Sequence, residues 1–203
     1  MLQDKKPTLT IMIIAANVLV FVWLSMFGMT EDGSYMLQHG AMYLPFVLEN
    51  GEYYRMFTCL FLHFGFSHLM NNMMMLFFLG SILEEEIGWW KYSILYLCSG
   101  LGGNIFSALY DLKMGEFAVS AGASGAIFGI IGALLMIIIK NHGRLRNLSG
   151  RGMLFMAVCS LYHGFSSTGV DNMAHIGGLV SGFCLAAVLY WKSNRKSSTL
   201  KRN

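Results

Sequence analysis

The chain has 203 residues, of which 55% are apolar and only 12% are charged. Soluble domains carry about 25% charged residues, so this composition excludes an ordinary water-soluble enzyme or binding module and indicates a chain solvated by lipid. The net charge of +3 says little by its total. The four cysteines, Cys59, Cys98, Cys159 and Cys184, lack CxxC spacing, and we expect them to be small buried hydrophobes.

Six apolar segments that are candidate membrane spans follow one another along the chain, the fifth of them short. The first begins after Lys5 and Lys6 and resembles a signal peptide, but its length and the absence of an A-x-A-like site predict a retained span. The predicted helices cover residues 9–27, 68–84, 89–110, 122–139, 152–165 and 172–191. We therefore expect an all-α membrane protein, a bundle of six transmembrane helices over 9–191, with a short N-terminal segment (1–8) and a basic tail (192–203).

The connection between the first two helices, residues 28–67, is unusually long for a loop. It is rich in aromatic and aliphatic side chains, whereas a disordered segment would be polar. We expect a structured outer loop that lies at or in the membrane interface.

Charge placement predicts the topology. With six spans both termini lie on one side, and 12 of the 14 basic residues then fall on that side, leaving only Arg55 and Lys113 opposite. Seven of the 11 acidic residues lie on the opposite side. By the positive-inside rule, we expect both termini to be cytoplasmic.

Polar side chains within membrane helices are costly, and four of them stand out here. His68 and Asn72 lie one helical turn apart in the second predicted helix, Ser124 lies in the fourth, and His175 lies in the sixth. Counted from the charged inner ends at a rise of about 1.5 Å per residue, all four reach the outer half of the membrane. Three separate helices thus bring polar groups to one depth.

Two GxxxG sequences, at 125–129 and 178–182, favour close contact between the fourth and sixth helices. Such contact would bring Ser124 to His175, and an imidazole can activate a serine hydroxyl as nucleophile. Asn72 and His68 could then donate hydrogen bonds to an oxyanion. Each residue taken alone has a plainer explanation in helix packing or at the interface, and composition and spacing leave both an enzyme and a transport path open.

Several segments resemble the signature sequences of rhomboid proteases. The stretches HLMNNMMML at 68–76, GASGAIFG at 122–129 and AHIGGLVSG at 174–182 are similar to the family's HxxxN, GxSG and AHxxGxxxG. EYYR at 52–55 resembles ExWR, and GSILEEEIG at 80–88 resembles GxxxExxxG. The resemblance covers about residues 9–191, in the family's order and with its six-helix count.

The resemblance implies a six-helix intramembrane serine endopeptidase with a Ser124–His175 dyad. Asn72, His68 and the backbone N–H of Ser124 would form the oxyanion hole. The resemblance also implies supporting roles for a further set: Gly122, Gly125, Phe128, Gly178, Gly182, Glu52, Arg55 and Glu84. Among these, Arg55 and Glu52 would anchor the first loop, and Glu84 would hold the inner end of the second helix.

The same resemblance implies the setting and the partners. The protein would be a multi-pass protein of the cell membrane with its active site towards the outer face. It would cut single-span membrane proteins in or near the outer end of their spans, and would need no cofactor, metal or nucleic acid. Because a substrate helix must unwind before attack, we expect small or helix-breaking residues near the cut.

Two positions depart from the family pattern. Phe128 stands where a tyrosine often stacks on the histidine, and Tyr54 replaces the tryptophan of ExWR. Neither change removes a catalytic group. Asp171, four residues before His175, is interpreted as the N-cap of the last helix and not as a third catalytic group, because aspartate is a favoured cap.

Two other functions remain as alternatives. An inactive rhomboid relative would bind membrane helices without cutting them, but such relatives lack the serine or the histidine, and this chain keeps both. A transporter or channel would be favoured by inverted repeats or by polar groups along a path across the membrane. The chain shows no repeat between its halves, and its polar groups cluster at one depth.

Overall fold

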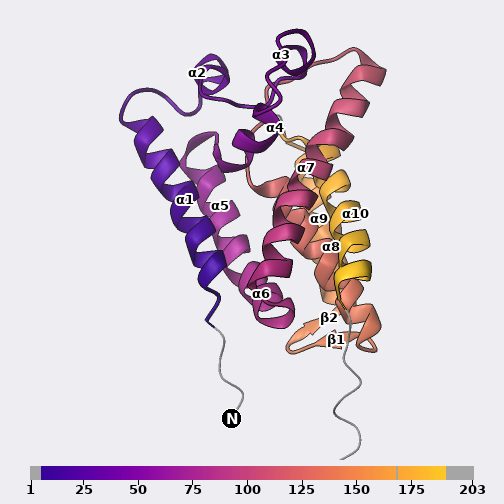
Figure 1. The fold of residues 1–203 in the computed structure, drawn as a ribbon. Helices are drawn as coiled ribbons and strands as arrows, with labels where there is room; N and C mark the ends of the chain where they lie inside the picture. The colour runs from indigo at the N-terminus through magenta and orange to yellow at the C-terminus, as the bar shows by residue number, and fades with distance from the viewer. Residues whose placement is uncertain (1–5, 168, 191–203) are drawn as a thin grey trace, which may run out of the picture.

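The computed structural model describes residues 6–167 and 169–190. This part of the chain is almost wholly helical, as expected for an all-α membrane protein (Figure 1). Its helices are α1 (Thr8–Ser25), α2 (Gly33–Gln38), α3 (Leu44–Glu49), α4 (Arg55–Thr58), η1 (Cys59–Phe61), α5 (Gly65–Met75), η2 (Leu76–Gly80), α6 (Ser81–Ile87), α7 (Trp89–Met114), α8 (Ser124–Lys140), α9 (Gly150–Phe165) and α10 (Asn172–Leu189). The basic tail at 192–203, most of the segment 1–8 and the expected end of the last helix at Trp191 lie outside the described residues.

Four of the described helical segments are long and apolar enough to cross a membrane: α1, the continuous run 65–87, α7 and α10. The apolar helix α8 has 17 residues, and α9 has 16. A helix of 17 residues rises about 26 Å, somewhat less than the hydrocarbon core. The count of six spans therefore stays a prediction.

The second predicted helix is interrupted in its middle. The α-helical segments α5 and α6 are joined by η2, a π-helical turn of five residues. Such insertions are rare and rotate the helix that follows relative to the one before. Periodicity alone predicted one regular helix at 68–84, because a π-turn leaves no simple signature in apolar spacing.

Helix α8 lies at the centre of the packing. Thirteen of its residues are buried, among them Phe128 and Ile130. An apolar surface on every side suits a helix enclosed by neighbours, and α8 packs against α7, α9, α10 and η2. Figure 1 shows α7 to α10 gathered on one side of the molecule and α1 on the other.

The long connection after α1 is folded, as expected, into α2, α3, α4 and η1. It lies at one end of the molecule, opposite a hairpin of two short strands, β1 (Arg144–Leu145) and β2 (Leu148–Ser149) (Figure 1). The strands pair antiparallel, Arg144 with Ser149. Helix α1 begins and α8 and α10 end at the hairpin end of the molecule, so the described basic residues gather there, with Arg55 and Lys113 at the other end.

One sequence expectation about burial is wrong. All four cysteines are free, but only Cys59 is buried, while Cys98, Cys159 and Cys184 are exposed on α7, α9 and α10. A helix surface that faces lipid is as apolar as the protein core, so an apolar neighbourhood in the sequence does not indicate burial in a membrane protein.

Candidate active site

Ser124 and His175 lie within hydrogen-bonding distance, although 51 residues separate them in the sequence. Ser124 is the first residue of α8, and His175 lies in the first turn of α10. The distance from His175 Nε2 to Ser124 Oγ is 2.8 Å. His175 is buried and Ser124 is partly exposed. This is the geometry in which an imidazole can take the proton of a serine hydroxyl.

Glycines allow this approach of α8 and α10. A Cβ atom added to Gly178 would overlap with the carbonyl oxygen of Gly125, and one added to Gly182 would overlap with that of Gly129. The two GxxxG faces therefore meet backbone to backbone, which only residues without a side chain permit. The hydrogen bond between Ser124 and His175 depends on this short separation.

The imidazole of His175 is held on its face by an aromatic ring. The rings of His175 and Phe128 are stacked, with centroids 4.4 Å apart and an interplanar angle of 12°. In the part of the chain that the structure describes, Asp171 makes no hydrogen bond to the imidazole. It caps α10 instead, accepting from the N–H of Ala174 at 2.8 Å, while its other oxygen accepts from Ser107 at 2.7 Å. Among the described residues, His175 Nδ1 has no hydrogen-bond partner.

The other two predicted polar residues line the same cavity as the pair. This cavity has a volume of about 730 Å³ and is lined by residues of α5, α8, α9 and α10, among them His68 and Asn72. The side-chain amide of Asn72 donates to the carbonyl oxygen of His68 at 3.1 Å, so one of its two N–H groups is engaged within α5. No other described residue accepts a hydrogen bond from this amide, so its second N–H is available to a ligand.

Gly122 shapes the turn before Ser124. Its φ of +143° is one that side chains rarely allow, and a Cβ there would lie 2.8 Å from Cε1 of His68. A glycine is therefore required at this position for two reasons: its backbone conformation and the nearness of the His68 ring. The turn brings His68 next to Ser124.

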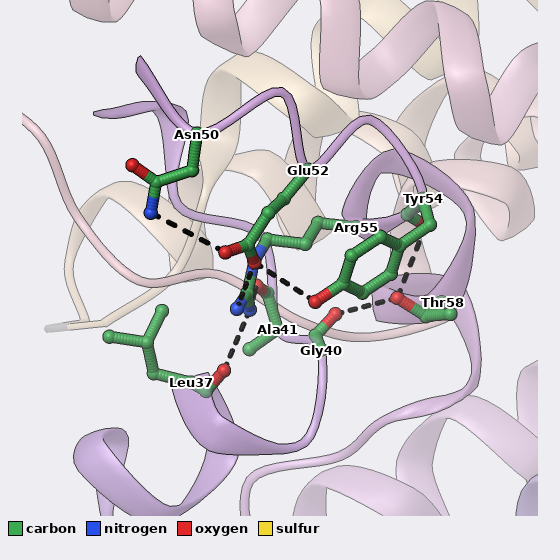
Figure 2. Close-up of polar contacts among 8 residues, drawn as sticks. All are labelled: Leu37, Gly40, Ala41, Asn50, Glu52, Tyr54, Arg55 and Thr58. Atoms are coloured by element: carbon green, nitrogen blue, oxygen red, sulfur yellow. Dashed lines mark hydrogen bonds and ion pairs between the residues drawn. The ribbon is translucent and has the colours of Figure 1, made fainter. Parts of the chain in front are cut away.

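Arg55 is the centre of the first loop, which connects α1 to α5 (Figure 2). Only 4% of it is exposed, and its guanidinium donates to the carbonyl oxygens of Leu37 and Ala41 at 2.7 and 2.9 Å. It also pairs with the carboxylate of Glu52 at 2.6 Å. The tyrosine at the altered motif position, Tyr54, donates its hydroxyl to the same carboxylate at 2.9 Å.

These contacts change the acidity of two loop groups. The hydrogen bond from Tyr54, and then the one from Arg55, hold the pKa of Glu52 below its ordinary value. The pKa of Tyr54 is raised, chiefly because its proton is shared with the Glu52 carboxylate. The carboxylate is therefore kept charged, and the loop is tied together through it.

Glu84 lies at the opposite end of the molecule and joins two helices. Its carboxylate accepts from the backbone N–H groups of Leu9 and Thr10 at 2.9 and 2.7 Å, and from the Thr10 hydroxyl at 2.8 Å. The N–H groups in the first turn of a helix have no partner within the helix. Glu84, in α6, supplies these partners and joins the start of α1 to α6.

Comparison with known proteins shows the family of the chain. The family model of the Rhomboid domain matches residues 50–192. The chain belongs to the rhomboid family. All of the candidate site residues named above lie within this matched range.

Curated relatives support the same family. The chain is similar to the rhomboid protease GluP of Bacillus subtilis (strain 168), with 34% identity over 187 residues, 92% of this chain and 36% of that protein. It is 44% identical to RHOMBOID-like protein 5 of Arabidopsis thaliana over 145 residues, 70% of this chain and 46% of that protein. RHOMBOID-like protein 1 of the same plant is 38% identical over 151 residues, 73% of this chain and 38% of that protein. The chain thus spans between a third and a half of the length of these three rhomboid relatives.

Sequence reasoning missed several residues around this rhomboid site. His63 is buried beside the turn that leads into Ser124, and Asn71, Ser160 and His163 line the cavity from α5 and α9. A histidine five residues before His68 in an apolar stretch was a usable signal. No comparable signal in the sequence marked Ser160 and His163, because the face that α9 turns toward the cavity is set by its packing against other helices.

Proposed function

We propose that this protein is an intramembrane serine endopeptidase in which Ser124 is the nucleophile and His175 its general base. The observation that carries the proposal is the 2.8 Å distance between Ser124 Oγ and His175 Nε2. Membership of the rhomboid family and similarity to a relative named as a rhomboid protease support it. Of the alternatives, an inactive relative would lack one member of this pair.

In the proposed mechanism, His175 takes the hydroxyl proton while Ser124 attacks the carbonyl carbon of the scissile peptide bond. The resulting imidazolium then protonates the leaving amine, and water hydrolyses the acyl-enzyme with His175 acting again as base. Phe128 keeps the imidazole in plane throughout. The oxyanion would be stabilised by the backbone N–H of Ser124, the free N–H of Asn72 and the ring of His68.

The proposed substrates are single-span membrane proteins, cut in or near the outer end of the span. A membrane helix pairs its own backbone groups, so its carbonyl cannot be attacked until the helix unwinds locally. Small or helix-breaking residues make such unwinding less costly. The cavity beside Ser124 is large enough to receive an unwound segment.

Incubation of purified protein with single-span substrates in liposomes, followed by mass spectrometry of the products, tests the activity. We expect cleavage by the wild type, none by Ser124→Ala or His175→Ala, and partial activity in Asn72→Ala, because one lost oxyanion donor costs about 10²–10³ in rate. Ser93→Ala, which changes a partly exposed serine of α7 that bonds to its own helix, is the matched control and should cut normally. Full activity of purified Ser124→Ala would reject the proposal.

We also propose that the termini are cytoplasmic and that the site faces the outer side of the cell membrane. The gathering of the described basic residues at the end opposite the first loop supports this orientation. Single cysteines at positions 34 and 198, in a chain without its native thiols, can be labelled from outside intact cells. We expect labelling at 34 alone. Labelling at 198 alone would show that the orientation is the opposite of the one proposed.

A further inference from the structure

The turn before Ser124 is hydrogen-bonded to the first loop at several closely spaced residues. Ser120 and Met42 exchange two backbone hydrogen bonds, at 2.8 and 2.9 Å. Two residues later, the N–H of Gly122 donates to the carbonyl oxygen of Cys59 at 2.9 Å. The backbone that leads into the nucleophile is thus paired with the first loop up to residue 122.

The last of these contacts uses a side chain. The backbone N–H of Ala123 donates to Nε2 of His63 at 3.4 Å. Ala123 directly precedes Ser124, and no side chain among the described residues caps the helix that begins there. The N–H of Ser124 thereby remains available to an oxyanion, while the preceding N–H is taken by His63.

The ring of His63 also contacts the second proposed oxyanion group. The rings of His63 and His68 meet edge to face, with centroids 5.2 Å apart. His63 therefore lies behind both the backbone and the side-chain part of the proposed oxyanion hole. A displacement of its ring would move both parts together.

The protonation of His63 suits this role. An Nε2 that accepts a hydrogen bond must be unprotonated, so the ring is neutral with its proton on Nδ1. His63 lies between η1 and α5, outside the membrane-spanning segments, and burial, followed by the nearby His68, lowers its pKa to about 3. It is therefore neutral at every pH at which a serine–histidine pair operates.

Burial of this histidine has a cost that packing alone does not explain. Only 1% of His63 is exposed. Burial of an imidazole removes its polar nitrogens from water, which costs free energy that an apolar side chain of that size does not incur. Leucine would fill a comparable volume without that cost, so the imidazole is better explained by what its Nε2 does.

We infer that His63 is a positioning residue, which holds the turn before Ser124 so that the backbone N–H of Ser124 and the His68 ring converge on the oxyanion. This inference rests on the proposed function. In this role His63 does not touch the substrate. Its loss should lower kcat and leave KM nearly unchanged, because the geometry of the transition state is affected and the binding of the substrate helix is not.

The test compares His63→Leu, His63→Gln and His63→Asn in liposomes with one single-span substrate. Glutamine can present an acceptor near the position of Nε2, whereas asparagine reaches only the position of Nδ1. We expect kcat to fall about tenfold to a hundredfold in the leucine and asparagine variants, since small misplacements near reacting atoms cost up to about 10². The glutamine variant should recover most of the rate at equal KM.

Stability and reactivity are measured in parallel. Leu83→Ala removes a fully buried side chain of α6, at the end of the molecule opposite the first loop (Figure 1), so it should lower the unfolding temperature and leave kcat unchanged. Reaction of Ser124 with a fluorophosphonate should slow in His63→Leu as kcat does. If His63→Leu does not fold, the ratio of kcat between the glutamine and asparagine variants tests whether His63 positions the turn.

Two outcomes overturn the inference. Equal kcat in the glutamine and asparagine variants, or an unchanged kcat in a folded His63→Leu, would show that His63 only fills space while the proposed function stands. A wild-type protein that neither cleaves substrates nor reacts with the fluorophosphonate would overturn the proposed function and the inference together.

Discussion

The imidazole of His175 lies parallel to the ring of Phe128, at a centroid distance of 4.4 Å. The family pattern often has a tyrosine at this position. Here phenylalanine stacks on the imidazole and has no hydroxyl. The contact limits the rotation of an imidazole whose Nδ1 has no partner among the described residues.

This stack predicts which substitutions of Phe128 preserve activity. Phe128→Tyr should keep kcat within about twofold of the wild type, whereas Phe128→Leu should lower it by up to about tenfold, because stacked aromatic pairs contribute about 0.5–1.5 kcal/mol. Steady-state cleavage in liposomes measures both. Equal rates for the leucine and tyrosine variants would show that the aromatic face does not position His175.

The contact between α8 and α10 predicts a strong effect at Gly178. Gly178→Ala places a Cβ against the carbonyl oxygen of Gly125, so the helices must separate and the hydrogen bond from Ser124 to His175 must lengthen. We expect cleavage to be nearly abolished and stability to fall by about 1–3 kcal/mol, as for other overpacked interiors.

The matched control for this change is Gly33→Ala. Gly33 begins α2, and an added Cβ meets nothing within 4 Å. Activity and thermal unfolding of both variants should be measured in the same detergent. Normal cleavage by Gly178→Ala would mean that α8 and α10 can separate without losing the catalytic pair.

Glu84 should matter for stability more than for chemistry. Glu84→Ala removes three hydrogen bonds to the first turn of α1, and charged hydrogen bonds contribute about 1.5–3 kcal/mol each. We expect a marked drop in unfolding temperature, with kcat retained at temperatures where the variant stays folded. Glu85→Ala breaks the more exposed pair with Arg146 and should change stability by less than about 1 kcal/mol. Similar losses in the two variants would contradict the joining of α1 and α6 by Glu84.

The lowered pKa of Glu52 predicts how the first loop responds to acid. Because the pKa is lower in the folded state than in the unfolded chain, the ionised carboxylate stabilises the loop fully above the ordinary value of 4.5. This contribution is lost as the pH falls through the lower folded-state pKa. The unfolding temperature of the wild type should therefore decline more steeply as the pH falls below 4.5 than that of Glu52→Gln.

The control for this titration is Glu49→Gln, which changes an exposed carboxylate in α3. Its pH profile should follow the wild type. Tyr54→Phe removes the first cause of the shift and should move the acid transition of the loop to higher pH. Profiles of Glu52→Gln and wild type that run parallel would show that the Glu52 carboxylate does not stabilise the loop.

Much of the fold and of the candidate site could be predicted from local features of the sequence. Apolar runs indicated the helices, and the rise per residue placed Ser124 and His175 at one depth, because depth along a helix depends only on position within it. The glycine pairs indicated which two helices approach, since a missing side chain is a property of the residue itself. The cap formed by Asp171 was also readable, because it involves a residue three positions away.

Only the tertiary structure decided how the helices are turned and how closely they meet. The π-turn at Leu76–Gly80, the stacking of Phe128 on His175, the bond from Asn72 to its own helix and the contact of His63 with Ala123 follow from that arrangement. The orientation of a helix about its axis depends on contacts with residues far away in sequence. In a membrane this dependence is stronger still, because lipid and protein core are equally apolar and hydrophobicity does not tell which face turns inward.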